Sequence, residues 1–409
     1  MSENVIDITN VAMLLKVETT EGVDAAPTAA DAFPFETDGY SYNSPFASEA
    51  SNEATGTKVA GAPLIVGQPA EISIRVRLKG ANATYTSSVK PPHHALLTIA
   101  GWRGLFTAAV AAAALTAGTT NSATLGASFS STARAYLGMP LIMSGLAAGA
   151  HPLVIEYTAG RLATLSDEFA SVLTVGTSAE IAANWTYAGT SPQDAAARLT
   201  DEPTGTLYIY EDGNLLKFVA CRASLDSLSA DTAKPGFATF KLMGIFAGET
   251  SAAIPSGIAL PAHSAPTLVQ GLTGVSPAFS VNRKPLMISN FSLADAAELS
   301  SMEDPNTNFG FGSGLIGGRV PMLSCDPAKT HVAVRSTLSD MQNKAQFCGA
   351  VRFLGAAGNR IAITLPLMQT AKSDPALRGK KRAEQNDYRL MTNGRDAQGR
   401  TTEKILCFY

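Results

Sequence analysis

Residues 206–248 read TLYIYEDGNLLKFVACRASLDSLSADTAKPGFATFKLMGIFAG, and this stretch decides the fold class. It begins with two apolar runs, TLYIY and LLKFVA, whose aromatic and β-branched side chains are typical of strands. The Asp212-Gly213 pair between them favours the tight turn of an antiparallel hairpin. Another apolar run, at 237–246, predicts a further strand. The middle of the chain is therefore expected to form an antiparallel β-sheet.

Strand patterns continue on both sides of this stretch. Residues 71–79 alternate between apolar and polar side chains, as in a strand with one buried face. Two short helices are also expected, one opened by Pro91-Pro92 and running through Ile99, the other opened by Asp326-Pro327 and running through Met341. The chain is predicted to be mainly β, and its later strands are expected at 286–293, 308–311, 346–354 and 360–365, with a glycine-rich turn at 355–359.

One apolar stretch, 95–115, is long enough to be tested as a membrane span. Arg103 lies near its centre, and a charge there costs about 2.5–3.5 kcal/mol on insertion scales. A buried helix is therefore predicted instead, and no membrane partner is expected. The first residues lack the basic and apolar regions of a signal peptide. The four cysteines have no metal-type spacing, so free thiols in a reducing compartment are expected.

The charges are few and unevenly distributed. Only 16% of the 409 residues are charged, against about 25% in an average soluble domain. This low charge suggests a surface largely covered by other protein, as in an assembly subunit. Residues 1–56 carry ten acids and one base, whereas residues 371–409 carry nine bases and five acids. The two ends are expected either to attract each other between copies of the chain or to be separately solvated.

Three groups of charged residues are candidates for contacts between subunits. The basic run at 378–382 has the charge to bind phosphate or nucleic acid, but it lacks interleaved aromatic residues, so a subunit contact or a solvated segment is favoured. The polar face of residues 71–79 is expected to meet the acidic N-terminal segment of a neighbour. The candidates are Glu18, Glu21, Asp24, Asp31, Arg75, Arg77, Lys79, Lys380, Lys381 and Arg382.

No motif in the sequence indicates catalysis. HExxH, P-loop, GxSxG and clustered Cys/His patterns are absent. Gly312, Gly314 and Gly317 match GxGxxG, but Gly318 and Pro321 forbid the helix that a dinucleotide site needs, so a strand end and flexible turn are predicted there. We expect no catalytic, cofactor-binding or metal-binding residue, no cofactor, and a protein that is not an enzyme. A hydrolase on a β scaffold has no motif to support it.

The order of features suggests a duplicated chain with an insertion. Segments 214–248 and 284–318 share an apolar strand, an acidic connection and a second Phe-containing strand that ends in glycines. Between them, residues 105–206 are rich in Ala, Thr, Ser and Gly. We predict a first unit from residues 1–104 and 207–255, with an acidic N-terminal arm at 1–56. We also predict an inserted small β module at 120–200. A second unit is predicted at 256–409, and it ends in the basic C-terminal segment.

Several of these pieces resemble the tail tube proteins (major tail proteins) of tailed bacteriophages. The opening VAMLLKVETTEGVDAAPTAAD (11–31) is similar to the N-terminus of that family. PPHHALLTIAGW (91–102) resembles its Pro-led helix, residues 206–248 its hairpin and long strands, and GAAGNRIAITLP (355–366) its final turn and strand. Part of the insert, within 135–169, resembles a small β module of phage structural proteins. The pieces occur in the expected order.

The resemblance implies a duplicated β-barrel or sandwich fold and a virion structural protein. Rings would stack into a long hollow tail that guides the genome into the host, and they would be assembled in the host cytoplasm. Two tube-like halves suit a trimeric ring with pseudo-sixfold symmetry, and a hexamer is the alternative. Tape-measure and tail-end proteins would be partners, and DNA would pass through the lumen without specific binding. Lumen-facing candidates are Asp226, Asp231, Asp295 and Glu298.

A binding protein is the alternative from another class. The Ser/Thr/Ala-rich insert also suits a secreted or surface β-sandwich binding protein. The absence of a signal-peptide pattern at the start of the sequence counts against it.

Overall fold

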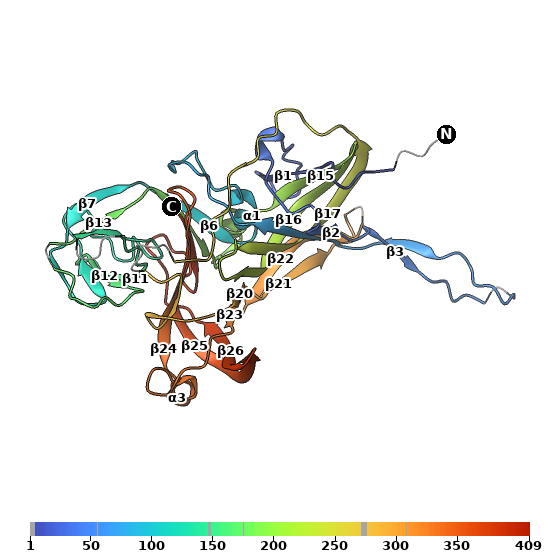
Figure 1. The fold of residues 1–409 in the computed structure, drawn as a ribbon. Helices are drawn as coiled ribbons and strands as arrows, with labels where there is room; N and C mark the ends of the chain where they lie inside the picture. Colours follow the sequence, from blue (N-terminus) through green and yellow to red (C-terminus); the bar gives the residue numbers. More distant parts are fainter. Residues whose placement is uncertain (1–4, 55, 146–148, 175, 271–275, 308) are drawn as a thin grey trace.

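The computed structural model describes residues 5–54, 56–145, 149–174, 176–270, 276–307 and 309–409 (Figure 1). The chain is mainly β, with 46% of residues in strands and 6% in helices, which confirms the predicted class. The described strands form several sheets, and they do not close into a barrel.

A 16-stranded sheet forms the body of the molecule. Its main path runs β19-β18-β24-β25-β26-β23-β20-β16-β17-β5-β2, with β1, β15, β14, β27 and β6 attached to it. The bounds are β1 (Val11–Val17), β2 (Tyr40–Tyr42), β5 (Ala70–Arg77), β6 (Trp102–Thr107), β14 (Asn184–Gly189), β15 (Gly205–Glu211), β16 (Asn214–Asp231), β17 (Phe237–Ser251), β18 (Phe279–Val281), β19 (Lys284–Pro285), β20 (Asn290–Ala294), β23 (Met322–Cys325), β24 (Gln346–Phe353), β25 (Ile361–Arg378), β26 (Lys381–Leu390) and β27 (Ile405–Phe408).

The predicted central hairpin is present. β15 and β16 pair antiparallel around Asp212-Gly213, and both turn residues have positive φ, as a tight hairpin turn requires. β16 then pairs with β17 along nearly its whole length. β5 pairs with β17 and alternates as predicted, with Ile72, Ile74 and Val76 buried in the main core. The alternation of side chains therefore placed these strands correctly.

The N-terminal segment is partly built into the sheet. β1 pairs with β15 over its whole length, and Met13, Leu14 and Leu15 are buried. Residues 11–17 are thus part of the fold, which corrects the expectation that residues 1–56 form an arm.

Residues 110–181 surround a second apolar core. It contains Leu137, Leu141 and Tyr157, and it also includes Ile405 of β27. Gly138 lies against Ile405 with a φ of +76°. The strands around this second core are β7 (Val110–Ala114), β8 (Ala117–Gly118), β9 (Ser122–Thr124), β10 (Ile142–Ser144), β11 (Val154–Tyr157), β12 (Leu162–Leu165) and β13 (Ser178–Ile181). The boundaries predicted for the two units and the inserted module stay a prediction.

Two further hairpins lie outside the main sheet. β21 (Ala297–Glu303) pairs with β22 (Phe311–Arg319) and packs on β16 and β17. β3 (Phe46–Glu49) pairs with β4 (Leu64–Gly67), and this hairpin extends far from the rest of the chain in Figure 1. We call its described residues, 46–54 and 56–67, the arm.

The helices are short, and two of them differ from the sequence predictions. α1 (His94–Ile99) follows the two prolines as expected, but it ends near Gly101, whose φ is +72°. The predicted helix at 95–115 is therefore wrong beyond Ile99, because the chain turns there and pairs β6 with β14. The other helices are η1 (Ala29–Asp31), α2 (Ala195–Asp201) and α3 (Thr337–Gln342).

α3 is shorter than predicted. It begins ten residues after Pro327, behind Ser336, whose side chain accepts a hydrogen bond from the Ser339 N–H. The GxGxxG segment also differs, because residues 311–319 continue as the strand β22 in place of a flexible turn. The strand predicted at 308–311 begins only at Phe311, and residue 308 lies outside the described residues. No described helix combines the length and apolarity needed to span a membrane.

Candidate assembly surfaces

The arm presents apolar side chains to solvent. Leu64 and Ile65 on β4 are 64% and 63% exposed. At its base, Phe46 contacts the rings of Phe246 and Phe309, with centroids 6.3 and 5.2 Å apart. The base is thus fixed by aromatic packing on β17, whereas the apolar side chains of β4 lack such cover within the described chain. Large apolar side chains on a projecting hairpin mark an interaction surface.

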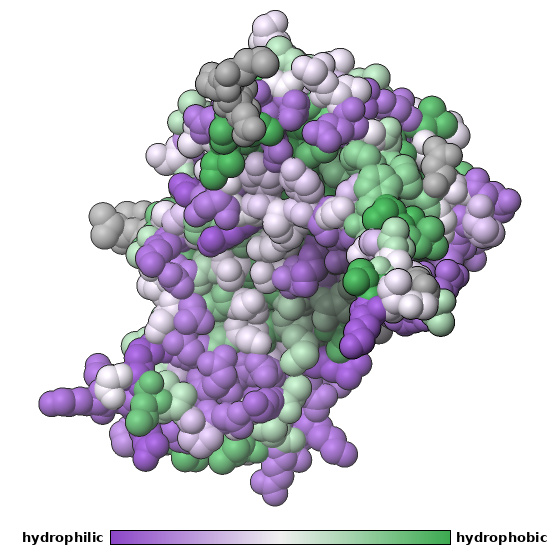
Figure 2. Space-filling model, turned by 90° about the vertical axis from the view of Figure 1, so that its right-hand side faces the viewer, coloured by the Kyte–Doolittle hydropathy of each residue, from purple (hydrophilic) through white to green (hydrophobic). Residues whose placement is uncertain are grey.

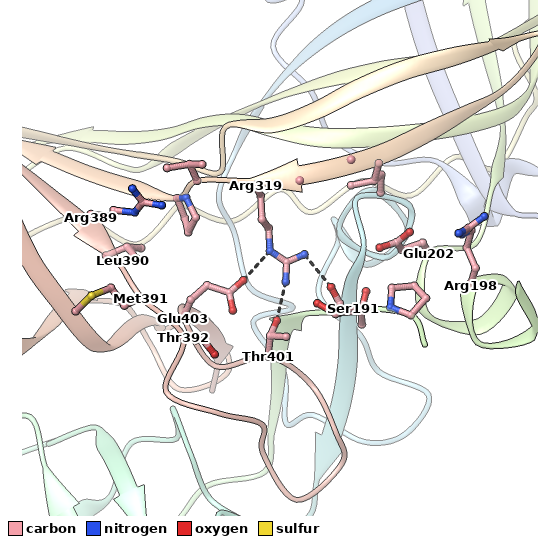
Figure 3. Close-up of a pocket in the computed structure, with 17 residues that line it drawn as sticks. Ser191, Arg198, Glu202, Arg319, Arg389, Leu390, Met391, Thr392, Thr401 and Glu403 are labelled. Atoms are coloured by element: carbon pink, nitrogen blue, oxygen red, sulfur yellow. Dashed lines mark hydrogen bonds and ion pairs between the residues drawn. The ribbon is translucent and has the colours of Figure 1, made fainter. Parts of the chain in front are cut away.

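A cavity lies where several distant segments meet. We call this cavity of about 810 Å³ the arginine pocket (Figure 3). It is lined by residues 190–192, by Arg198 and Glu202 of the α2 region, by the end of β22, by residues 389–392, and by Thr401 and Glu403.

One arginine in the pocket is fully engaged within the chain. Arg319 donates hydrogen bonds to Oε1 of Glu403 at 2.8 Å, to the carbonyl oxygen of Thr190 at 2.8 Å and to the Thr401 hydroxyl at 2.7 Å. Burial alone would raise the pKa of Glu403, but the positive charges of Lys404 and Arg319 outweigh it and lower that pKa. Arg319 therefore links the end of β22 to residues 190, 401 and 403 of the pocket lining.

The other two arginines stand at opposite ends of the pocket (Figure 3). Arg198 and Arg389 are exposed, and neither guanidinium has an ion pair or hydrogen bond with any described residue. The buried Glu202 lies beside Arg198, and burial raises the pKa of its carboxyl against the pull of the surrounding arginines. The charge of Arg198 also acts on the carboxyls of Glu202 and Glu21, but neither Arg198 nor Arg389 forms a direct contact with a carboxylate of the described residues. Both guanidinium groups can therefore form hydrogen bonds with an incoming carboxylate.

The structure corrects the prediction that Asp295 faces a lumen. Its side chain is buried, accepts a hydrogen bond from the Trp102 indole at 3.2 Å, and lies 2.5 Å from Nζ of Lys404. Lys404 also lies over the Trp102 ring, 4.8 Å from its centroid. Asp295 therefore joins the loop between β20 and β21 to the C-terminal segment.

The other lumen candidates lie at the surface. Asp226 and Asp231 are paired within the chain, with Lys241 at 2.7 Å and Lys234 at 2.8 Å. Glu298 is exposed on β21. The structure does not test whether these three line a lumen.

The acidic inter-subunit candidates have partners in their own chain. Glu18 is buried and accepts hydrogen bonds from Thr204, Thr206, Gly22 and Ala220, so the structure corrects the expectation that it is free for another subunit. The other three acidic candidates are more exposed, and each also has a partner in its own chain. Glu21 forms an ion pair with Arg222, and Asp24 forms an ion pair with Lys217 and accepts a hydrogen bond from the Tyr208 hydroxyl. Asp31 accepts hydrogen bonds from the backbone N–H and the hydroxyl of Thr28.

The basic candidates fall into two places. Arg75 lies over the Phe237 ring, Arg77 pairs with Glu36 at 3.1 Å, and Lys79 donates to the Pro261 carbonyl oxygen. Lys380, Lys381 and Arg382 are exposed at the tip of the β25–β26 hairpin. Figure 2 shows mostly hydrophilic side chains over the lower part of the molecule, where that hairpin lies in Figure 1. The structure brings neither group together with the acidic candidates.

Sequence reasoning missed the arginine pocket. Its lining comes from three stretches that are distant in sequence, within 190–202, 316–321 and 389–403. The local sequence signal is Gly317-Gly318-Arg319 at the end of a strand, and Gly317 also belongs to the GxGxxG pattern. The described residues contain no group of three or more His, Cys, Asp or Glu side chains placed to hold a metal ion.

The comparisons with known proteins identify no family. No family model matches the chain, and the search of curated proteins finds no match.

Proposed function

We propose that this protein is a structural subunit of a phage tail tube, which assembles into stacked rings around a channel for the genome. The observation that carries the proposal is the arm, because a hairpin that projects from the body with exposed Leu64 and Ile65 is suited to contact another molecule. The ordered resemblance of the sequence to tail tube proteins supplies the identity of the assembly.

The arrangement of the long hairpins supports a duplicated tube fold. β16–β17 and β25–β26 are the two longest hairpins, and β20 and β23 lie between them in the same sheet. A ring of three chains would then present six such hairpins, which suits pseudo-sixfold symmetry. Strand pairing between copies would also cover the free sheet edges at β19 and β2.

The charges of the β16–β17 hairpin suit a channel that does not bind DNA tightly. Asp226 and Asp231 are balanced by Lys241 and Lys234. A wall with little net positive charge gives phosphates no strong binding site, so the genome can slide. In this proposal no cofactor takes part, the chain has no enzymatic role, and the site of action is the virion tail.

Electron microscopy and native mass measurement test the proposal. Negative-stain images of the purified protein are expected to show stacked rings or tubes, and the ring is expected to have the mass of three chains of 42.5 kDa each. A ring of six chains would overturn the trimer while keeping the tube. Monodisperse monomers at high concentration would contradict the proposed function.

The structure also decides which truncation is informative. Removing residues 1–40 deletes β1 and its buried Met13, Leu14 and Leu15, so such a variant loses part of the core. Its failure to polymerise would not distinguish assembly from folding. Changes in the exposed arm avoid this problem.

A further inference from the structure

We propose that the arginine pocket of one copy receives the arm of a second copy. This inference rests on the proposed self-assembly and names the two surfaces that form one of its contacts.

The arm has the chemistry of a ligand for this pocket. It carries Glu49 and Glu53, both exposed and without an ion pair to any described residue, together with the exposed Leu64 and Ile65. β3 and β4 hold Glu49, Leu64 and Ile65 on a paired hairpin, and the aromatic contacts of Phe46 fix its base. Less conformational freedom is therefore lost on docking than for a disordered tail.

The pocket offers the complementary groups. Arg198 and Arg389 present guanidinium groups without a hydrogen-bonded partner among the described residues at its two ends, and a guanidinium binds a carboxylate through two parallel hydrogen bonds. The pocket lining also includes apolar side chains that suit the leucine and isoleucine of the arm, and these are Ile316, Val320, Pro321, Leu390 and Met391. A volume of about 810 Å³ is in the range of sites that enclose a ligand.

The direction of the arm requires a second copy. In Figure 1 the arm leads away from the rest of the chain, so the pocket of its own chain is not its target. Two copies that exchange arms reciprocally would form a closed two-fold dimer, whereas an arm passed from each copy to the next is a head-to-tail contact that produces closed rings or open filaments. The proposed tube requires the head-to-tail arrangement.

Charge reversal tests the contact. R198E/R389E and E49R/E53R change only exposed side chains, so both variants are expected to keep the circular dichroism spectrum and Tm of the wild type. Each is expected to raise the protein concentration needed for polymers, measured by sedimentation, by about tenfold or more. The combined four-residue variant restores opposite charges and is expected to polymerise near the wild-type concentration.

A matched control separates the pocket from general charge effects. K16E/K344E makes the same change in net charge at exposed sites outside the pocket and is expected to polymerise like the wild type. If this control loses polymers as R198E/R389E does, or if the combined variant gains nothing over the single reversals, the proposal is wrong.

Cysteine cross-linking gives an independent readout. The four native cysteines are buried, and burial raises their pKa values, so they contribute little background reaction. E53C/T392C places one thiol on the arm and one at the rim of the pocket, and it is expected to give disulfide-linked chains of several copies. E53C/N343C, with its second thiol outside the pocket, is the control.

The outcomes distinguish this inference from the proposed function. Wild-type tubes that tolerate charge reversal, with no more cross-linking in E53C/T392C than in E53C/N343C, overturn the arm contact and leave the tube function standing. A wild-type protein that forms no polymer overturns both.

Discussion

Nζ of Lys404 lies 2.5 Å from Oδ1 of Asp295, and both side chains are almost completely buried. The two residues are 109 positions apart, and Trp102 contacts both of them. The pair therefore ties three distant parts of the chain together: the loop after β20, the start of β6 and the segment that leads into β27.

Removing one member of this pair is expected to be costly. Lys404→Met leaves the carboxylate of Asp295 buried without its cation, and the free energy of unfolding is expected to fall by about 3–5 kcal/mol. The double variant D295N/K404M is expected to lose less, because no buried charge remains. Urea denaturation of the unassembled protein measures both. Lys241→Met, at an exposed pair, is the control and should change stability by at most about 1 kcal/mol. Equal effects at the two lysines would contradict the structure.

Glu18 is expected to hold the N-terminal strand in place. Its carboxylate accepts from the Ala220 N–H at 2.8 Å and from two threonine hydroxyls, beside a bulge where Ala220 has a φ of +52°. In Glu18→Gln an amide NH₂ replaces one acceptor, so a buried donor loses its partner at a cost of about 1–3 kcal/mol. Denaturant unfolding measures the loss. Glu49→Gln, at an exposed arm residue, should stay within about 0.5 kcal/mol of wild type; a similarly small effect at Glu18 would show that its contacts do not stabilise the fold.

Buried histidines are expected to make the fold less stable in mild acid. Burial lowers the pKa values of His93, His94 and His151 to about 4, whereas an unfolded histidine titrates near about 6.5. Between these two pH values the unfolded chain binds protons that the folded chain does not. Stability therefore falls as the pH decreases from about 6.5 to 4, by up to about 1.4 kcal/mol per pH unit for each histidine.

His151 offers a direct test of this pH dependence. Burial lowers its pKa most, Arg360 and Arg352 lower it further, and Asp167 opposes them. The free energy of unfolding of His151→Gln is expected to depend less steeply on pH in this window than that of wild type. A wild-type stability that is flat between pH 4 and 6.5 would falsify the prediction.

Gly138 is expected to be required where the second core meets β27. A Cβ at this position would lie less than 2.5 Å from Cγ2 of Ile405, and its φ of +76° also disfavours a side chain. Gly138→Ala is expected to destabilise the fold by about 1–3 kcal/mol, measured as a lower Tm. Gly257→Ala has a similar φ of +84° but open space around the added methyl group, so it isolates the backbone cost. If both variants lose the same stability, the contact with Ile405 is not tight.

The sequence predicted those elements whose pattern is local. The alternation at 71–79 and the Asp212-Gly213 turn each correspond to an observed strand or turn. The stretch 95–115 has an apolar, alanine-rich composition that favours a helix, whereas β6 is set by pairing with β14 some 80 residues later. Such long-range pairing leaves no mark in the local pattern.

The charged sites were harder to predict than the strands. Asp295 and Asp226 are both aspartates, but Asp295 is buried against Lys404, whereas Asp226 is exposed. The local sequence does not distinguish them, because Lys404 lies 109 residues after Asp295. The arginine pocket joins residues from about 190 to 403, so no window of the sequence contains it. The phage resemblance and the lumen candidates stay predictions.

The pairing of distant strands also has a kinetic consequence. Val11 lies opposite Glu211 in the β1–β15 pair, and Trp185 lies opposite Phe408 in the β14–β27 pair, so each contact closes a loop of roughly 200 residues. Sheets with such non-local pairs reach the native state slowly, because the entropy of loop closure is lost before the contacts form. During that delay the apolar side chains of the segments that become β16 and β25 are exposed to other nascent chains. Production in a cell is therefore expected to depend on chaperones and on low temperature more strongly than the stability of the finished fold would suggest.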